Sequence, residues 1–239
     1  MKRTRRAIMV VMCLVLTLLL GSAQAASLSV TGSATVTAEP DQALVQLGVQ
    51  ETQTEVTQAQ ALVNEKINAI LEALEKSEEY PIAPADITTA SYDIYPRYSY
   101  DDATGEQVLS GYRAECTLAI VVRDIDKVGM VIDAAFAAGA NEMDSIEFRL
   151  EDSSLVNDQA LTQALEDALH KAQLLAQAAG INLADYQMSL SASENSYGSN
   201  GRSVVYAMAD TVASTATSVR AGQLSFSASV NLTYTSSSK

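Results

Sequence analysis

The alternation of apolar and polar positions predicts two strands near the start of the chain. From Leu28 to Val36 apolar residues alternate with small polar ones, and after Pro40-Asp41 a second alternating run reaches Val49. Spacing of two puts the apolar side chains of each run on one face of a strand. We therefore predict two strands, each with one buried face.

A helix is predicted next. Thr52, with Glu55 three residues later, has the spacing of a capping box at a helix start. The following apolar residues recur at gaps of three and four, which places them on one helical face: Val56, Ala59, Val63, Ile67, Ile70 and Leu74. Proline cannot continue a helix, so we expect this one to end before Pro81.

The next two apolar segments predict a long β-hairpin. Ile87 to Tyr98 is rich in β-branched and aromatic residues, and Val108 to Val122 forms a second strand after a polar connection around Gly105. Pro96 has no N–H to donate to a neighbouring strand. Its part of the first strand is therefore expected at a sheet edge or a bulge.

Two further helices and three strands are predicted in the second half. A short helix can be capped by Asp124 or Asp126 and terminated by Gly139, with Ile125, Val128, Ile132 and Phe136 on its apolar face. The strands are Ile146–Leu150, Tyr186–Leu190 and Leu224–Tyr234. An alanine-rich helix runs from about Asn157 to Ala179, with an apolar face of Leu161, Leu165, Ala168, Ala172, Leu175 and Ala179. Residues 191–221, rich in Ser, Asn, Gly and Thr, read as a flexible loop.

These elements follow in the order β-β-α-β-β-α-β-α-β-β. We predict an α+β fold, a mainly antiparallel sheet with three packed helices. Residues 41–150 have the order βαββαβ, which a ferredoxin-like unit would show. Element order alone leaves the strand pairing open.

The first 25 residues indicate a signal peptide. Lys2, Arg3, Arg5 and Arg6 precede an uncharged run from Ala7 to Leu20, and Ala23-Gln24-Ala25 offers small residues for cleavage. We expect cleavage after Ala25, leaving residues 26–239 as one exported domain with no stable membrane span. We expect the protein in the periplasm or outside the cell, in association with the cell envelope.

Charge and residue counts exclude several classes of function. The net charge of −14, made more negative by removal of a cationic leader, argues against nucleic acid or an anionic membrane as partner. After cleavage Cys116 is the one cysteine left, and its place in an alternating segment favours a buried thiol. His170, the one histidine, lies in a helical stretch and is expected at the surface. These counts exclude zinc sites built on paired histidines or cysteine clusters.

We identify no catalytic, cofactor-binding or metal-binding residue. The chain has no phosphate-binding loop, dinucleotide fingerprint, zinc-protease motif or nucleophile elbow. The acids Asp101, Asp102 and Glu106 do not match a calcium loop, and nothing fixes a spacing among Glu147, Glu151 and Asp152 that glycoside chemistry would need. A carboxylate hydrolase is the weakest of the hypotheses.

Tyrosine is concentrated in the predicted hairpin. The candidate interaction surface consists of Tyr92, Tyr95, Tyr98, Tyr100 and Tyr112. Tyrosine combines rigid contact area with a polar tip, so this surface would suit a partner chain or a glycan. The alternative, which the pattern favours, is aromatic pairing within the hairpin itself.

The order of several short motifs resembles the SIMPL-domain family, which includes bacterial periplasmic immunogenic and oxidative-stress-defence proteins. The motifs are Val30-Thr31-Gly32, Pro40-Asp41-Gln42-Ala43, Asp86-Ile87-Thr88-Thr89, Gly111-Tyr112-Arg113-Ala114, the run Val121 to Lys127, and Ala138-Gly139-Ala140-Asn141-Glu142. The resemblance covers the mature chain, except that Lys76 to Pro81 lacks the family's usual helix-closing glycine and residues 191–221 align with no motif. It implies an exported, non-catalytic protein. Some relatives form ring- or channel-like homo-oligomers and some are linked to envelope or oxidative stress.

Two functional hypotheses remain. The first is an exported, non-enzymatic structural or interaction protein that self-assembles as a homo-oligomer and protects the cell envelope, with no cofactor. The second is an exported binding module for a small ligand, glycan or cation, motivated by the tyrosines and the negative charge.

Overall fold

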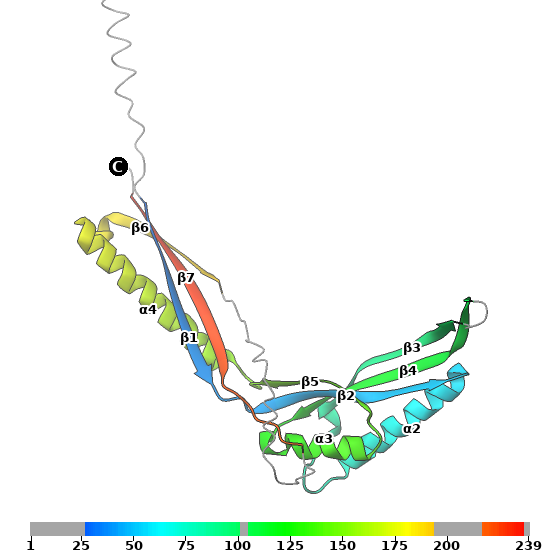
Figure 1. Ribbon diagram of the computed structural model, residues 1–239. Helices are drawn as coiled ribbons and strands as arrows, with labels where there is room; N and C mark the ends of the chain where they lie inside the picture. Colours follow the sequence, from blue (N-terminus) through cyan, green and yellow to red (C-terminus); the bar gives the residue numbers. More distant parts are fainter. Residues whose placement is uncertain (1–26, 101–104, 194–216, 237–239) are drawn as a thin grey trace, which may run out of the picture. The chain divides into compact units, whose positions relative to one another are not determined.

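The computed structural model describes residues 27–100, 105–193 and 217–236, which divide into two compact units (Figure 1). One unit is built on the strands β1 (Ser27–Ala38), β6 (Tyr186–Ser193) and β7 (Leu224–Ser236) with the helix α4 (Ser154–Ala179). The other is built on β2 (Gln42–Gln53), β3 (Ile87–Tyr100), β4 (Gln107–Val122) and β5 (Glu142–Arg149) with α2 (Val56–Glu75) and α3 (Val128–Ala137). The predicted α+β class and the predicted order of strands and helices are confirmed.

The larger unit contains a four-stranded antiparallel sheet of order β3-β4-β2-β5. β4 lies between β2 and β3, although β2 and β3 are joined in sequence by α2. This pairing is that of the predicted ferredoxin-like unit. The β3–β4 hairpin is confirmed, and Pro96 lies on β3, an edge strand of the sheet, as expected.

One face of this sheet and the apolar side of α2 form the core. Alternate residues of β2 and β4, among them Val45, Leu47, Leu118 and Ile120, are buried. The predicted apolar face of α2 is confirmed, since Ala59, Val63, Ile67, Ile70 and Leu74 are buried. The predicted capping box is wrong. Thr52 belongs to β2, where it pairs with Arg113 of β4. The N-cap of α2 is Glu55, whose side chain makes no capping hydrogen bond.

α3 covers the same face of the sheet. Asp124 begins the preceding 3₁₀ turn η2 (Ile125–Lys127) by accepting the N–H of Asp126 at 3.2 Å, and Gly139 ends the helix at φ 121°. The buried positions are Val128, Val131, Ile132 and Ala135. Phe136, predicted on this face, is instead exposed at the margin of the buried stripe.

The segment after residue 216 is held against α3. The backbone N–H of Thr217 donates to Oδ2 of Asp133 at 3.0 Å, and the Thr217 hydroxyl donates to Oδ1 at 2.5 Å. A Cβ at Gly129 would stand 2.1 Å from the Thr217 carbonyl oxygen, so glycine permits this approach. Val219 packs against the core. Within the predicted loop, Thr217 thus contacts the helix and Val219 contacts the core. Residues 191–193 complete β6, and residues 194–216 lie outside the described part of the chain.

The smaller unit packs α4 on a three-stranded sheet of order β1-β7-β6. The predicted apolar face of α4 was partly wrong: the buried residues form an alanine stripe with a spacing of four, namely Ala160, Ala164, Ala168, Ala172 and Ala176. Leu175 and Ala179 are exposed, and Leu161 and Leu165 are half-buried. Small residues on the helix allow close packing on the sheet, so the larger leucines lie at the sides of the contact. In the described segments no helix combines the length and hydropathy that a membrane span requires.

Candidate functional site

The predicted tyrosine surface lies on the β3–β4 hairpin. Tyr92 is 40% exposed and its hydroxyl donates to Oδ1 of Asn64 on α2 at 3.2 Å, while Tyr112 is half-buried opposite Pro96. Tyr95, Tyr98 and Tyr100 are more exposed. The structure therefore joins Tyr92 and Tyr112 to the packed body and leaves the other three tyrosines at the surface.

The end of this hairpin is a two-stranded arm. β2 pairs with β4 only as far as Tyr112, so Gln107–Gly111 pair with Arg97–Tyr100 alone; we call these two segments the hairpin arm. Tyr98 lies opposite Leu109, and the two side chains are 54% and 50% exposed. Tyr100 is 73% exposed, and Val108 is exposed as well. Large apolar and aromatic groups thus gather where neither α2 nor β2 covers them.

Gly111 fixes the base of the arm. A Cβ at this position would stand 2.5 Å from the carbonyl oxygen of Gln53, the last residue of β2. The register shifts between Arg97 and Tyr98, where Gly111 and Leu109 oppose consecutive β3 residues and Ser110 is the extra residue of β4. The Ser110 hydroxyl donates to the Arg97 carbonyl oxygen at 3.0 Å. A bulge of this kind increases local twist and redirects the strands that follow it.

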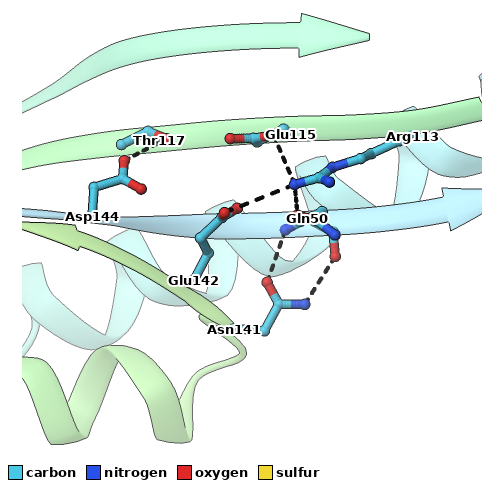
Figure 2. Close-up of polar contacts among 7 residues, drawn as sticks. All are labelled: Gln50, Arg113, Glu115, Thr117, Asn141, Glu142 and Asp144. Atoms are coloured by element: carbon cyan, nitrogen blue, oxygen red, sulfur yellow. Dashed lines mark hydrogen bonds and ion pairs between the residues drawn. The ribbon is translucent and has the colours of Figure 1, made fainter. Parts of the chain in front are cut away.

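A polar network surrounds Arg113 on the face of the sheet opposite α2 (Figure 2). The guanidinium donates to Oε1 of Gln50 and lies 3.3 Å from Oε2 of Glu115 and 3.8 Å from Oε1 of Glu142. Residues 113, 115 and 50 belong to β4 and β2, whose core residues alternate with them. The period of two along each strand therefore collects these polar side chains on one face.

Asn141 extends the β2–β5 ladder with its side chain. The backbone N–H of Gln50 donates to Oδ1 of Asn141, and Nδ2 of Asn141 donates to the Gln50 carbonyl oxygen, both at 2.8 Å. The N–H of Asn141 also donates to the Gly48 carbonyl oxygen at 3.0 Å. The amide thus substitutes for a strand backbone and positions Glu142 opposite Gly48, beside Arg113 (Figure 2).

The charged form of Glu142 is disfavoured in this network. Burial and repulsion from Glu115 raise the pKa of Glu142, against the opposing effect of Arg113. Oε2 of Glu142 and Nε of Arg113 are buried with no hydrogen-bond partner among the described atoms. Nearby, the Thr117 hydroxyl donates to Oδ2 of Asp144 at 3.3 Å. The side chains of this network therefore hold one another in place, and the carboxylate of Glu142 is weakly stabilised.

A second network lies around Arg123, just beyond β4. Its Nε and Nη2 donate to the two oxygens of Asp86 at 3.2 and 3.0 Å, and Nη1 donates to Oε1 of Glu151 at 2.6 Å. The N–H of Glu151 in turn donates to Oδ1 of Asp41 at 2.8 Å. These bonds connect the starts of β2 and β3 to the ends of β4 and β5. The two-bond pairing of guanidinium and carboxylate also fixes their orientation.

The family model described as "SIMPL: Protein of unknown function (DUF541)" matches residues 28–234. The chain belongs to the SIMPL family. It is 31% identical over 163 residues to the "26 kDa periplasmic immunogenic protein" of Brucella abortus (strain S19), covering 67% of this chain and 64% of that relative. It is 32% identical over 146 residues to the "Uncharacterized protein YggE" of Escherichia coli (strain K12), covering 61% of this chain and 57% of that relative. The matches thus span less than two thirds of the length of these relatives.

The segments that carried the resemblance to the SIMPL family make up much of the two networks. Gly111 and Arg113 come from one motif, and Asn141 and Glu142 come from another. Asp41, Asp86 and Arg123 come from three more. These residues contact residues on or next to other strands of the same sheet, so the SIMPL motifs have a role in holding the fold. Gln50, Glu115, Thr117 and Asp144 were not singled out by sequence, although their alternation with core residues marks them as sharing a face.

The other candidate residues have structural partners or positions. Cys116 is 3% exposed, as predicted, and burial raises the pKa of its thiol. His170 is exposed on α4, also as predicted. Among the weighed acids, Glu151 pairs with Arg123 and Asp152 accepts the N–H of Ser154 at 2.8 Å. Asp101 and Asp102 lie outside the described residues. No group of three or more acids, histidines or cysteines within the described ranges is arranged to hold a metal ion.

Proposed function

We propose that this SIMPL protein is an exported, non-enzymatic structural or interaction protein that assembles with copies of itself in the cell envelope. The hairpin arm carries the proposal. It presents Tyr98, Tyr100 and Leu109 on a ribbon that no other described element covers. Interfaces are enriched in tyrosine, and exposed apolar clusters on a soluble protein favour a partner surface.

The edge of the sheet adds a second attachment point. β3 is an edge strand over its full length, from Ile87 to Tyr100, and its outer backbone groups are available for pairing. Pro96 interrupts that edge because it lacks an N–H. Edge pairing would therefore be divided around Pro96, with side-chain contacts of the arm supplying most of the interface.

The non-enzymatic part of the proposal is supported by how the polar groups are used. Arg113 bonds to side chains of neighbouring strands, Arg123 bonds to Asp86 and Glu151, which lie next to strands, and Cys116 is a buried thiol. A nucleophile would need an adjacent base and access to substrate. The export part is supported by the name of the Brucella relative, which describes that protein as periplasmic. The stress-protective role remains what the family resemblance implies.

A pair of matched variants tests the role of the arm. Leu109→Ser removes an apolar group from the hairpin arm, and Leu155→Ser removes an equally sized group from α4, where Leu155 is 78% exposed. Sedimentation velocity of the mature protein should show smaller particles for Leu109→Ser and wild-type particles for Leu155→Ser. If the two variants sedimented alike, the hairpin arm would not be the surface that mediates self-assembly. Far-UV circular dichroism confirms that both remain folded.

The second candidate is an exported binding module for a small ligand, glycan or cation. A half-open pocket at the end of β4 favours the small ligand. A ligand that binds only the folded state raises the melting temperature in proportion to its saturation. A thermal-shift screen of small polar and amphiphilic compounds would support this candidate, and a uniformly unchanged melting temperature would count against it.

A further inference from the structure

The pocket at the end of β4 is lined by both apolar and charged residues. It measures about 160 Å³ and is lined by Tyr80, Pro81, Ile82, Asp86, Val121, Val122, Arg123, Asp124 and Lys127. Five of these nine residues belong to the run Val121 to Lys127, one of the motifs that carried the family resemblance. The pocket lies at the opposite end of β4 from the hairpin arm, so self-assembly through the arm does not account for it.

The volume limits the apolar group that the pocket can accept. An apolar protein cavity of about 150 Å³ is large enough to bind benzene. The apolar lining includes Pro81, Val121 and the buried side chain of Ile82. A phenyl or isobutyl group is therefore small enough to fit.

The loop that forms one wall is fixed in place. Nζ of Lys127 donates to the carbonyl oxygen of Glu79 at 2.6 Å, and the N–H of Tyr80 donates to Oγ of Ser77 at 3.1 Å. Residues 77–80 are thus bonded to the side chain of Lys127 and to one another. A wall held in this way needs little reordering when a ligand enters, which lowers the entropic cost of binding.

Two of the charged residues that line the pocket, Lys127 and Asp124, can form further hydrogen bonds with a ligand. Arg123 is occupied by Asp86 and Glu151. Lys127 uses one donor on Glu79 and lies 3.6 Å from Oδ2 of Asp124, beyond a hydrogen bond. An ammonium group has three donors, and a carboxylate accepts more than the one N–H that Asp124 receives from Asp126. One cation and one anion therefore stand side by side, each with unused hydrogen-bonding capacity.

The electrostatic charge around the pocket favours some classes of ligand over others. Among the lining residues Asp86 and Asp124 balance Arg123 and Lys127. Glu151, which pairs with Arg123, and the net charge of −14 of the whole chain make the surroundings negative. A free anion would be repelled, whereas a neutral zwitterion would not. An amine alone would satisfy Asp124 and leave the remaining donors of Lys127 without a partner.

We propose that this pocket binds a free α-amino acid with a medium-sized apolar side chain. The side chain lies against the apolar lining, the α-carboxylate accepts from Lys127, and the α-ammonium donates to Asp124. Within a longer peptide these two groups are not carried together on one residue, which excludes peptides as equivalent ligands. The inference rests on the binding-module candidate, to which it gives a ligand class, and it does not depend on self-assembly.

Titration calorimetry of the mature protein tests this proposal with L-phenylalanine and L-leucine. The expected dissociation constant is on the order of 1 mM, because the ligand is small and both charged partners are partly exposed. Three compounds each lack one feature: 3-phenylpropionate has no ammonium, 2-phenylethylamine has no carboxylate, and glycine has no apolar side chain. Each should bind at least ~5-fold more weakly. Equal binding by any of them, or no saturable binding of the two amino acids, overturns the proposal.

A matched pair of variants locates the site. Asp124→Asn removes the charge but retains the cap of η2, because asparagine caps as well as aspartate. It should weaken L-phenylalanine binding at least ~5-fold. Asp126→Asn makes the same charge change at a residue that does not line the pocket and should leave binding unchanged. Wild-type binding by Asp124→Asn, or equal losses in both, would contradict the assignment. The solution mass of each variant reports self-assembly separately, so the two proposals can fail independently.

Discussion

Gly32 of β1 lies directly against the backbone of α4, so that a Cβ at this position would stand 2.1 Å from the carbonyl oxygen of Ala164. The same Cβ would stand 2.7 Å from the Cβ of Ala168. The alanine stripe and the glycine are therefore two sides of one close contact. Asp167 supports it by accepting the N–H of Ser33 at 2.9 Å, and Lys171 donates to the Thr31 carbonyl oxygen at 3.2 Å.

Replacing this glycine tests the closeness of the contact. Gly32→Ala inserts a methyl group into helix backbone, so it should lower the free energy of unfolding by about 1–3 kcal/mol or more. Gly222→Ala is the matched control, because a Cβ there meets nothing within 4 Å; it should be neutral or slightly stabilising. Urea unfolding followed by circular dichroism measures both. A neutral Gly32→Ala would show that α4 does not pack as closely as described.

The alanine stripe shows where the sequence alone was insufficient. The periodicity of α4 predicted its existence and its end near Ala179, but leucines and alanines were both placed on the buried face. Which of them packs depends on Gly32, more than a hundred residues away in sequence. The apolar face of α2 was predicted correctly because its large residues recur on a single stripe. The capping box predicted at Thr52 was wrong for a similar reason, because the pairing of Thr52 with a distant strand overrides the local capping pattern.

Asn141→Asp tests the side-chain ladder at the end of β5. The aspartate can still accept the N–H of Gln50, but an oxygen would then face the Gln50 carbonyl oxygen in place of the Nδ2 donor. The loss of stability should be about 1–3 kcal/mol. Asn64→Asp retains the acceptor that Tyr92 uses and should cost less. Chemical denaturation compares the two, and an equal effect would mean that the Asn141 bonds contribute little.

The Arg113 network was predictable only in part. Alternation places Gln50 and Glu115 on the face opposite the core, and that much can be read from the sequence. Their meeting with Glu142 depends on the register of β2 with β5, including the shift between Gln46 and Leu47. Register set by a bulge has no local sequence signal of its own, so residues from three strands could not be brought together beforehand.

Glu142→Gln should alter the pH dependence of stability. Burial and Glu115 raise the pKa of Glu142 above its ordinary value of 4.5 in the folded protein. The folded state therefore binds this proton more tightly than the unfolded state, and this residue's contribution to stability falls as pH rises between the two pKa values. Glutamine does not titrate, so the stability of the variant relative to wild type should rise over that interval and then stay constant.

Denaturation of both proteins between about pH 4 and pH 8 measures that difference. Glu147→Gln on the same strand is a suitable control, because it removes the same charge outside the Arg113 network. A stability difference for Glu142→Gln that does not change with pH would contradict the raised pKa. A stability difference that decreases as pH rises would mean that the pKa of Glu142 is lowered in the folded protein.

Cys116 should react slowly while the protein is folded. The thiol is buried in β4 and its pKa is raised by burial, so little reactive thiolate is present at the surface. Alkylation by iodoacetamide, followed by mass spectrometry, should be fast in urea and strongly suppressed without it. Rapid alkylation of the folded protein would instead indicate an accessible thiol and weaken the structural interpretation of this residue.

Self-assembly is the central claim, and the solution mass of the purified mature chain tests it most directly. Light scattering after size exclusion should give a multiple of the single-chain mass, because the hairpin arm leaves Tyr98, Tyr100 and Leu109 uncovered in one copy. That mass should decrease when Tyr98 and Leu109 are both replaced by serine. A wild-type mass equal to one chain at all accessible concentrations would contradict the account.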